Sequence, residues 1–155
     1  MASAQGTYVV ERMNGVQPSV IIEMVPSCLF TPISIVPSCL YTDPEIASVG
    51  ITEEEARKKG VPVRCGRYTM SVNGQAIISK EEKGFIKVLF AADSDVLLGA
   101  QVMCPRATDM IGELATAIAN GLTSTQLMYA MRAHPTFNEA ISCAVENSRE
   151  SKSRW

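Results

Sequence analysis

The sequence predicts an α+β domain in which an antiparallel β-meander sheet has its helices packed on one face. The chain has 155 residues, 46% of them apolar, and a formal net charge of −2, so it can bury enough surface to form one packed domain. Short apolar segments joined by links of a few residues fill its middle, and links that short join antiparallel strands. Segments with helical periodicity come after these strands, which predicts a helical layer on one side of the sheet.

Residues 1–51 predict a short helix followed by extended structure. The helix covers residues 1–12 and ends near Asn14-Gly15, a common turn pair. No capping residue precedes it, as we expect of a chain cut from a longer protein. In the extended part, Val25-Pro-Ser-Cys-Leu-Phe-Thr-Pro32 recurs as Val36-Pro-Ser-Cys-Leu-Tyr-Thr42. Two copies are too few for a solenoid, so the repeat is either a duplicated strand or an irregularity of the sequence.

Residues 19–41 are long enough and apolar enough to cross a bilayer, with Glu23 as their one charged side chain. Pro26, Pro32 and Pro37 would disrupt a spanning helix, and the β-branched residues around them favour strands. The N-terminus also lacks the basic and apolar regions of a secretion signal. We therefore expect a cytoplasmic protein with no membrane segment.

Residues 52–103 predict one helix and the strands of the meander. Thr52-Glu-Glu-Glu55 is a capping box, and Gly60 ends the helix that it begins. Turn residues at 73–74, 83–84 and 93–95 divide the rest of this region. The predicted strands are residues 61–70, 75–79, 85–91 and 97–103.

Three helices are predicted for the remaining residues. The first has one apolar face and stops at Gly121. Thr123-Ser-Thr-Gln126 is a second capping box, which starts a short helix through Met131. The last helix begins at Thr136 or Phe137 and runs to about Ser148. The apolar face of the first helix consists of Met110, Ile111, Leu114, Ala117 and Ile118.

Several classes of function are disfavoured by composition and spacing. A pI near 5.4 leaves no cationic surface for nucleic acid. The ten glycines form neither G-x-G-x-x-G nor a P-loop, so the chain has no standard nucleotide-binding loop. The five cysteines form no C-x-x-C or C-x4-C pair, which predicts no metal site and no redox disulfide. These cysteines are Cys28, Cys39, Cys65, Cys104 and Cys143.

His134 is the single histidine of the chain and the first candidate for acid-base chemistry. Pro135 biases it toward an extended backbone, just before the last predicted helix. A helix N-terminus opposes the imidazolium form and leaves a neutral ring available as a base. A lone histidine is also commonly a half-buried structural residue, so the residues alone leave both interpretations open.

Glu139 also has two interpretations. Thr136-Phe-Asn-Glu139 is a capping box, which explains the carboxylate without catalysis. The functional alternative is that Glu139 accepts the imidazole N–H of His134, as the acid does in a hydrolase triad. A hydrolase is disfavoured because the sequence has no G-x-S-x-G elbow.

An ordered set of motifs favours the catalytic interpretation of His134 and Glu139 over the structural one. The set resembles the C-terminal dimerisation domain of dihydrolipoamide dehydrogenases, in the pyridine nucleotide-disulfide oxidoreductase family. Residues 133–140, Ala-His-Pro-Thr-Phe-Asn-Glu-Ala, resemble the active-site signature of that family. The other matching segments are residues 36–56, 73–76, 83–88 and 98–102.

The resemblance implies a division of the chain into three parts. Residues 36–150 are the dimerisation or interface domain. Residues 16–35 are an irregular connection that contains the duplicated segment, which the family pattern has once. Residues 1–15 are the remnant of the last FAD-domain helix, because Ala2-Ser-Ala-Gln-Gly6 resembles that helix. The chain is then a C-terminal fragment without the two dinucleotide-binding domains.

The resemblance also implies a function and partners. The intact enzyme is a homodimer that uses FAD, NAD and a redox disulfide to oxidise the dihydrolipoyl groups of a lipoyl-bearing protein. His134 would be the base that acts in the partner subunit's site, oriented by Glu139. Pro135, expected to be cis, and Thr136 would position the ring. We expect no cofactor bound to the fragment and no activity from it alone.

Two alternatives to a dihydrolipoamide dehydrogenase domain remain open from the sequence. One is the same domain of a glutathione reductase-like enzyme, although Ala133 and Asp43-Pro-Glu45 favour the lipoamide branch by resemblance. The other is a stand-alone self-association module without catalysis.

Overall fold

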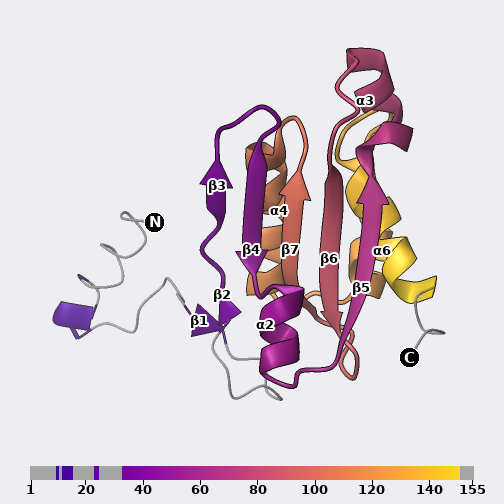
Figure 1. The fold of residues 1–155 in the computed structure, drawn as a ribbon. Helices are drawn as coiled ribbons and strands as arrows, with labels where there is room; N and C mark the ends of the chain where they lie inside the picture. The colour runs from indigo at the N-terminus through magenta and orange to yellow at the C-terminus, as the bar shows by residue number, and fades with distance from the viewer. Residues whose placement is uncertain (1–9, 11, 16–22, 25–32, 151–155) are drawn as a thin grey trace.

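The computed structural model describes residue 10 and residues 12–15, 23–24 and 33–150 (Figure 1). Most of the predicted helix over residues 1–12 lies outside the described residues, as does the first copy of the repeat. Glu23–Met24 (β1) and Ile33–Ser34 (β2) pair as a short antiparallel ribbon. Among the described residues, no helix has both the length and the apolar character that crossing a membrane requires.

A five-stranded antiparallel sheet forms the centre of the fold, in the order β3-β4-β7-β6-β5. Strands β5, β6 and β7 pair in chain order, as predicted for three strands of the meander. A short turn joins β6 to β7, whereas the longer segment of residues 70–84 connects β5 to β6. Strand β4 pairs with β7 on the side opposite β6, and helix α2 (Glu53–Lys58) then connects β4 to β5 at the far edge of the sheet. The predicted α+β class is confirmed. The strands are Ser38–Leu40 (β3), Ile46–Gly50 (β4), Val63–Thr69 (β5), Phe85–Ala91 (β6) and Leu97–Met103 (β7).

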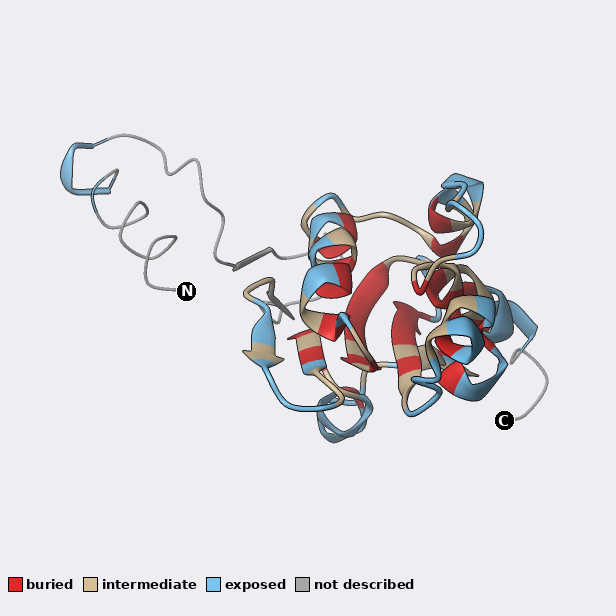
Figure 2. Cartoon of the chain, turned by 90° about the horizontal axis from the view of Figure 1, so that it is seen from above, coloured by how far each residue is buried: buried red, intermediate tan, exposed pale blue. Residues whose placement is uncertain are grey.

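Two long helices cover one face of this sheet (Figure 1). Helix α4 (Ala107–Ala119) packs on β4 and β7, and helix α6 (Glu139–Glu150) packs on β5 and β6. Between helices and sheet lies the apolar core, seen as the buried inner layer in Figure 2. Helix α2 (Glu53–Lys58) is drawn at the opposite face, beside one end of the sheet. The helical layer therefore forms as predicted, with α2 outside it.

Gly66 allows α6 to approach the sheet closely. A Cβ at this position would lie 1.9 Å from the carbonyl oxygen of Ala144 and 2.7 Å from Cβ of Ser148. The backbone of β5 is thus in direct contact with α6, which no larger residue would permit. This contact fixes the helix that begins with Glu139.

The predicted strand over residues 75–79 is wrong. These residues form helix α3 (Gly74–Ser79), which follows a 3-10 turn at Met70–Val72 (η1). Asn73 caps the helix, since its side-chain oxygen accepts the N–H of Ala76 at 3.0 Å. Ile77 and Ile78, the source of the strand signal, are 51% and 66% exposed and pair with no strand of the sheet. The local cap therefore outweighs their β-propensity.

Both capping boxes in the remaining short helices form as predicted. Thr52 and Glu55 close the N-terminus of α2, and Thr123 and Gln126 close that of α5 (Ser124–Tyr129). These reciprocal bonds involve residues three apart, so the pattern is local enough to be recognised in the sequence.

Glu45 caps α4 from outside the helix. Its Oε2 accepts the backbone N–H of Thr108 at 2.9 Å and the hydroxyl of the same residue at 2.7 Å. The Thr108 hydroxyl contributes most to lowering the pKa of Glu45, and the backbone N–H contributes next. A carboxylate at a helix N-terminus is also favoured by the helix dipole.

We expect Glu45→Gln to lower the free energy of unfolding by about 1 kcal/mol at neutral pH. A folded-state pKa below the ordinary 4.5 means that the ionised form stabilises the fold above that pH. This stabilisation is lost as the pH falls through the folded-state pKa, so the two proteins should converge in acid. Urea unfolding at neutral pH and at about pH 3 measures the difference. Glu82→Gln, at an exposed site, is the control, and an undiminished difference in acid would contradict the assignment.

Candidate functional site

His134 lies in the loop between α5 and α6, residues 130–138. Its side chain is 79% exposed, so the ring is open to an external reactant. Its Nδ1 lies 2.9 Å from Oε1 of Glu139, the first residue of α6. The two acid-base residues singled out in the sequence are therefore in direct contact.

Glu139 uses its two carboxylate oxygens for different bonds. Oε1 bonds the imidazole, while Oε2 accepts the backbone N–H of Thr136 at 2.9 Å. The Thr136 N–H contributes most to lowering the pKa of Glu139, followed by the bond to His134. An ionised carboxylate can only accept hydrogen bonds, so Nδ1 of His134 carries the hydrogen. In the neutral ring, Nε2 then holds the free lone pair that a base requires.

The backbone around His134 is fixed by hydrogen bonds within the loop and by one from α3. The His134–Pro135 peptide bond is cis, as the resemblance implies. The hydroxyl of Thr136 donates to the carbonyl of Ala133 at 2.7 Å, which closes the loop around the histidine. From α3, the side-chain amide of Asn73 donates to the carbonyl of Thr136 at 3.2 Å. Thr136 is thus held from three directions.

The predicted capping box at this helix forms only in part. Glu139 accepts from the backbone of Thr136, but the Thr136 hydroxyl turns to Ala133. Helix α6 consequently begins at Glu139, after the predicted start at Thr136 or Phe137. The hydroxyl closes the loop because the chain turns at Pro135 before it becomes helical.

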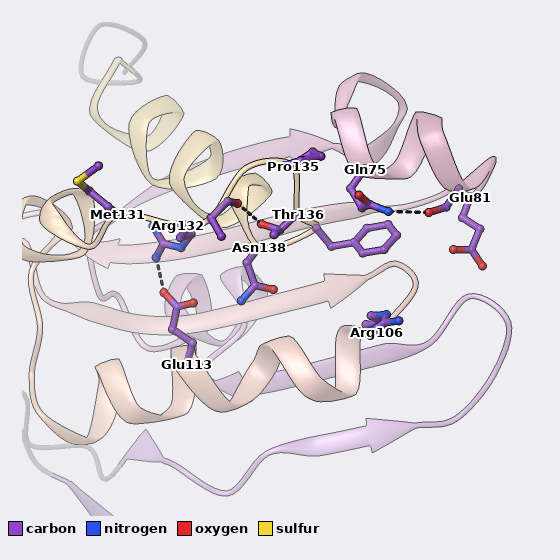
Figure 3. Close-up of a pocket in the computed structure, with 12 residues that line it drawn as sticks. Gln75, Glu81, Arg106, Glu113, Met131, Arg132, Pro135, Thr136 and Asn138 are labelled. Atoms are coloured by element: carbon purple, nitrogen blue, oxygen red, sulfur yellow. Dashed lines mark hydrogen bonds and ion pairs between the residues drawn. The ribbon is translucent and has the colours of Figure 1, made fainter.

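Arg132 belongs to this loop and is a further residue of the site that no sequence motif marks. Its side chain is 6% exposed and forms an ion pair with Glu113 of α4 (Figure 3). A cavity of about 690 Å³ lies beside this pair, between the loop, α3 and the start of α4. The side chains around it include Gln75, Glu81, Arg106, Thr136 and Asn138, whereas His134 is not part of its wall. No local pattern marks Arg132, because the side chains that it bonds, Glu113 and Ser142, are 19 and 10 positions away.

Neither a metal site nor the thiols of Cys65, Cys104 and Cys143 offer a competing reactive centre in the described residues. No group of three or more His, Cys, Asp and Glu side chains in that part of the chain could hold a metal ion. Burial raises the pKa of the Cys65 and Cys143 thiols and raises that of Cys104 to about 12. A thiol that stays protonated at neutral pH is a poor nucleophile. Cys28 lies outside the described residues.

Comparison with known proteins gives a consistent match. Residues 36–145 match the model of the pyridine nucleotide-disulphide oxidoreductase dimerisation domain. The dihydrolipoyl dehydrogenase of Geobacillus stearothermophilus is 36% identical over 94% of this chain and 28% of its own length. That of Mycoplasma pneumoniae is 42% identical over 90% of this chain and 29% of its own length.

Solved structures show the same fold. LpdA from Mycobacterium tuberculosis superposes with a TM-score of 0.79 at 25% identity, over 96% of this chain and 30% of LpdA. The HOCl-induced flavoprotein disulfide reductase RclA from Escherichia coli gives a TM-score of 0.74 at 20% identity, over 90% of this chain and 30% of RclA. The chain thus spans less than a third of the relatives that it matches. It belongs to the pyridine nucleotide-disulphide oxidoreductases, and residues 36–145 are their dimerisation domain.

Proposed function

We propose that this chain is the dimerisation domain of a homodimeric flavoprotein that oxidises dihydrolipoyl groups, and that His134 and Glu139 are its acid-base pair. The observation that carries the proposal is the 2.9 Å contact between Nδ1 of His134 and the carboxylate of Glu139, on a ring otherwise open to solvent. The relatives named dihydrolipoyl dehydrogenase support this choice of substrate. In the proposed dimer, His134 acts in the site of the partner subunit.

The proposed role of His134 is to move protons, one at a time. Nε2 accepts the hydrogen of a dihydrolipoyl S–H group, which leaves a thiolate and an imidazolium. Only the thiolate attacks a disulfide efficiently. It forms a mixed disulfide with one sulfur of the redox pair, and the other sulfur leaves as a thiolate. His134 passes its proton to the thiolate that has left, and the regenerated base then takes the proton of the second S–H of the substrate. The resulting thiolate displaces the enzyme sulfur, which leaves as a thiolate, and closes the lipoyl disulfide.

Glu139 supports this transfer through Nδ1. Its negative charge stabilises the imidazolium that forms, and its bond keeps Nε2 directed away from α6. The second bond of its carboxylate, to the N–H of Thr136, keeps that charge in place while the ring changes protonation. Pro135 and Thr136 hold the backbone on which the ring sits.

The redox cofactors belong to other domains of the proposed enzyme. The chain has no glycine-rich loop for a dinucleotide, so we assign none of its residues to FAD or NAD. When bound in the intact protein, FAD and NAD+ would take up the electron pair released by the dithiol. The 155-residue chain should therefore have no dithiol oxidation activity alone.

Purified intact protein offers a direct test of the substrate. With NADH, we expect lipoamide to be reduced at least about 100-fold faster than oxidised glutathione, because active-site contacts discriminate between disulfide substrates by several kcal/mol. Absorbance of NADH measures both reactions. Preference for glutathione would replace the lipoyl assignment with the glutathione reductase-like one. No turnover with either would leave only self-association as the function of this domain.

A further inference from the structure

We propose that Arg132, paired with Glu113, is a positioning residue that fixes the loop on which His134 is presented. The inference rests on the function proposed above, because it assigns a role relative to the base. It concerns a buried side chain that touches neither substrate nor the imidazole.

The guanidinium of Arg132 joins three helices at the beginning of the loop. One nitrogen, Nη2, pairs with Glu113 on α4. The other, Nη1, donates to the carbonyls of Ala130 and Leu127 at 3.2 and 3.4 Å, and to the hydroxyl of Ser142 on α6. The last turn of α5, the middle of α4 and the first turns of α6 are thereby tied to one side chain.

An exposed imidazole needs such an anchor. The ring of His134 is 79% exposed, so packing contributes little to its position. The position of the ring is therefore set by its bond to Glu139 and by the backbone of the loop. Thr136 anchors the far end of that backbone through Asn73 and Glu139, and Arg132 anchors the near end, two residues before the histidine. The ring is therefore held between two fixed points.

The energetic cost of this arrangement also points to a positional role. Burying a guanidinium costs several kcal/mol before pairing, and replacing a buried ion pair by apolar residues is often neutral or stabilising. Arg132 is incompletely satisfied as well, because its Nε has no hydrogen-bond partner among the described residues. Stability alone would favour an apolar side chain here. Directional bonds to three helices are what an apolar side chain could not supply.

The test is steady-state kinetics of Arg132→Met in the intact flavoprotein, with dihydrolipoamide and NAD+. Met keeps most of the side-chain volume and removes every donor. We expect kcat to fall about 10- to 100-fold while KM for dihydrolipoamide changes less than about 3-fold. A displacement of the His134 imidazole by about 1 Å lowers kcat by such a factor, and no contact that binds the substrate is removed. Arg132→Lys, which retains a charge for Glu113, should recover part of the loss.

Arg64→Met is the matched control. Arg64 is also buried, pairs with Asp95, donates to the carbonyl of Ser148 and has an unpartnered Nε, but it lies at the other end of α6. Its loss should lower stability to a similar degree and leave kcat within about 2-fold, since distant sites act independently. Equal losses of kcat in both variants would overturn the proposal, because they would show a general effect of destabilisation.

The result also separates this inference from the proposed function. A wild-type enzyme that oxidises dihydrolipoamide, loses activity with His134→Ala and keeps it with Arg132→Met would overturn the positioning role alone. Retained activity with His134→Ala would instead overturn the proposed function, whatever Arg132→Met does.

Discussion

His134→Ala in the intact flavoprotein should slow the oxidation of dihydrolipoamide by about 100-fold or more, the usual loss when a general base is removed. The substrate thiol would then have to lose its proton to water. Reduction of the bound flavin by NADH does not use this base and should stay within about 2-fold of wild type. Stopped-flow absorbance of the flavin separates the two half-reactions.

A suitable control lies in the same loop. Met131 is 98% exposed, so Met131→Gln changes the loop surface without changing the acid-base pair. Its dihydrolipoamide oxidation should be close to wild type. Normal dithiol oxidation by the His134→Ala enzyme would remove the assigned role.

Hybrid dimers test whether the base serves the partner subunit. Subunits with His134→Ala are mixed with subunits in which a redox cysteine of the missing domains is replaced by serine. If the histidine acts across the dimer, each mixed dimer contains one complete site, and random pairing restores about a quarter of wild-type activity. No restored activity would place the base in its own subunit's site.

Gly66→Ala should produce the largest loss of stability, about 3 kcal/mol or more, because overpacking a tight contact forces the backbone to move. The new Cβ would lie 1.9 Å from the carbonyl of Ala144, and that atom cannot turn away as a flexible side chain could. Either α6 moves from the sheet or β5 is distorted. Urea unfolding of the chain measures the change in the midpoint.

Gly74→Ala is the matched substitution. A Cβ there has no neighbour within 4 Å, and the residue lies at the start of α3, where alanine is the better helix former. We expect an unfolding free energy equal to or up to about 1 kcal/mol above that of the original chain. Similar losses at both glycines would show that the contact with α6 is not the cause.

Elements specified by neighbouring residues could be predicted from the sequence. The capping boxes that begin at Thr52 and Thr123 each involve residues within one helical turn. The strands of the meander can be predicted from the turn residues between apolar segments. The failure at residues 75–79 has a local cause of the same kind. Asn73-Gly74 is a typical turn pair, whereas in the structure the side chain of Asn73 caps α3.

The site could be predicted only where a motif marks it. The His-Pro-Thr signature and its resemblance to a known family identify His134 and Glu139, which lie five positions apart within one motif. The contacts of the supporting residues span far more of the chain. Asn73 and Thr136 are separated by 63 positions, and Arg132 and Glu113 by 19. Such contacts depend on how the helices pack, which periodicity does not specify.

The exposed His134 ring has a practical consequence for studying assembly. The chain contains one histidine, so a ¹⁵N spectrum of the imidazole would show a single pair of ring signals. In the isolated chain those signals report only the bond to Glu139 and the surrounding water. Docking of a partner surface over the ring would change both resonances at once. The residue assigned to proton transfer is therefore also a built-in spectroscopic probe of dimer formation.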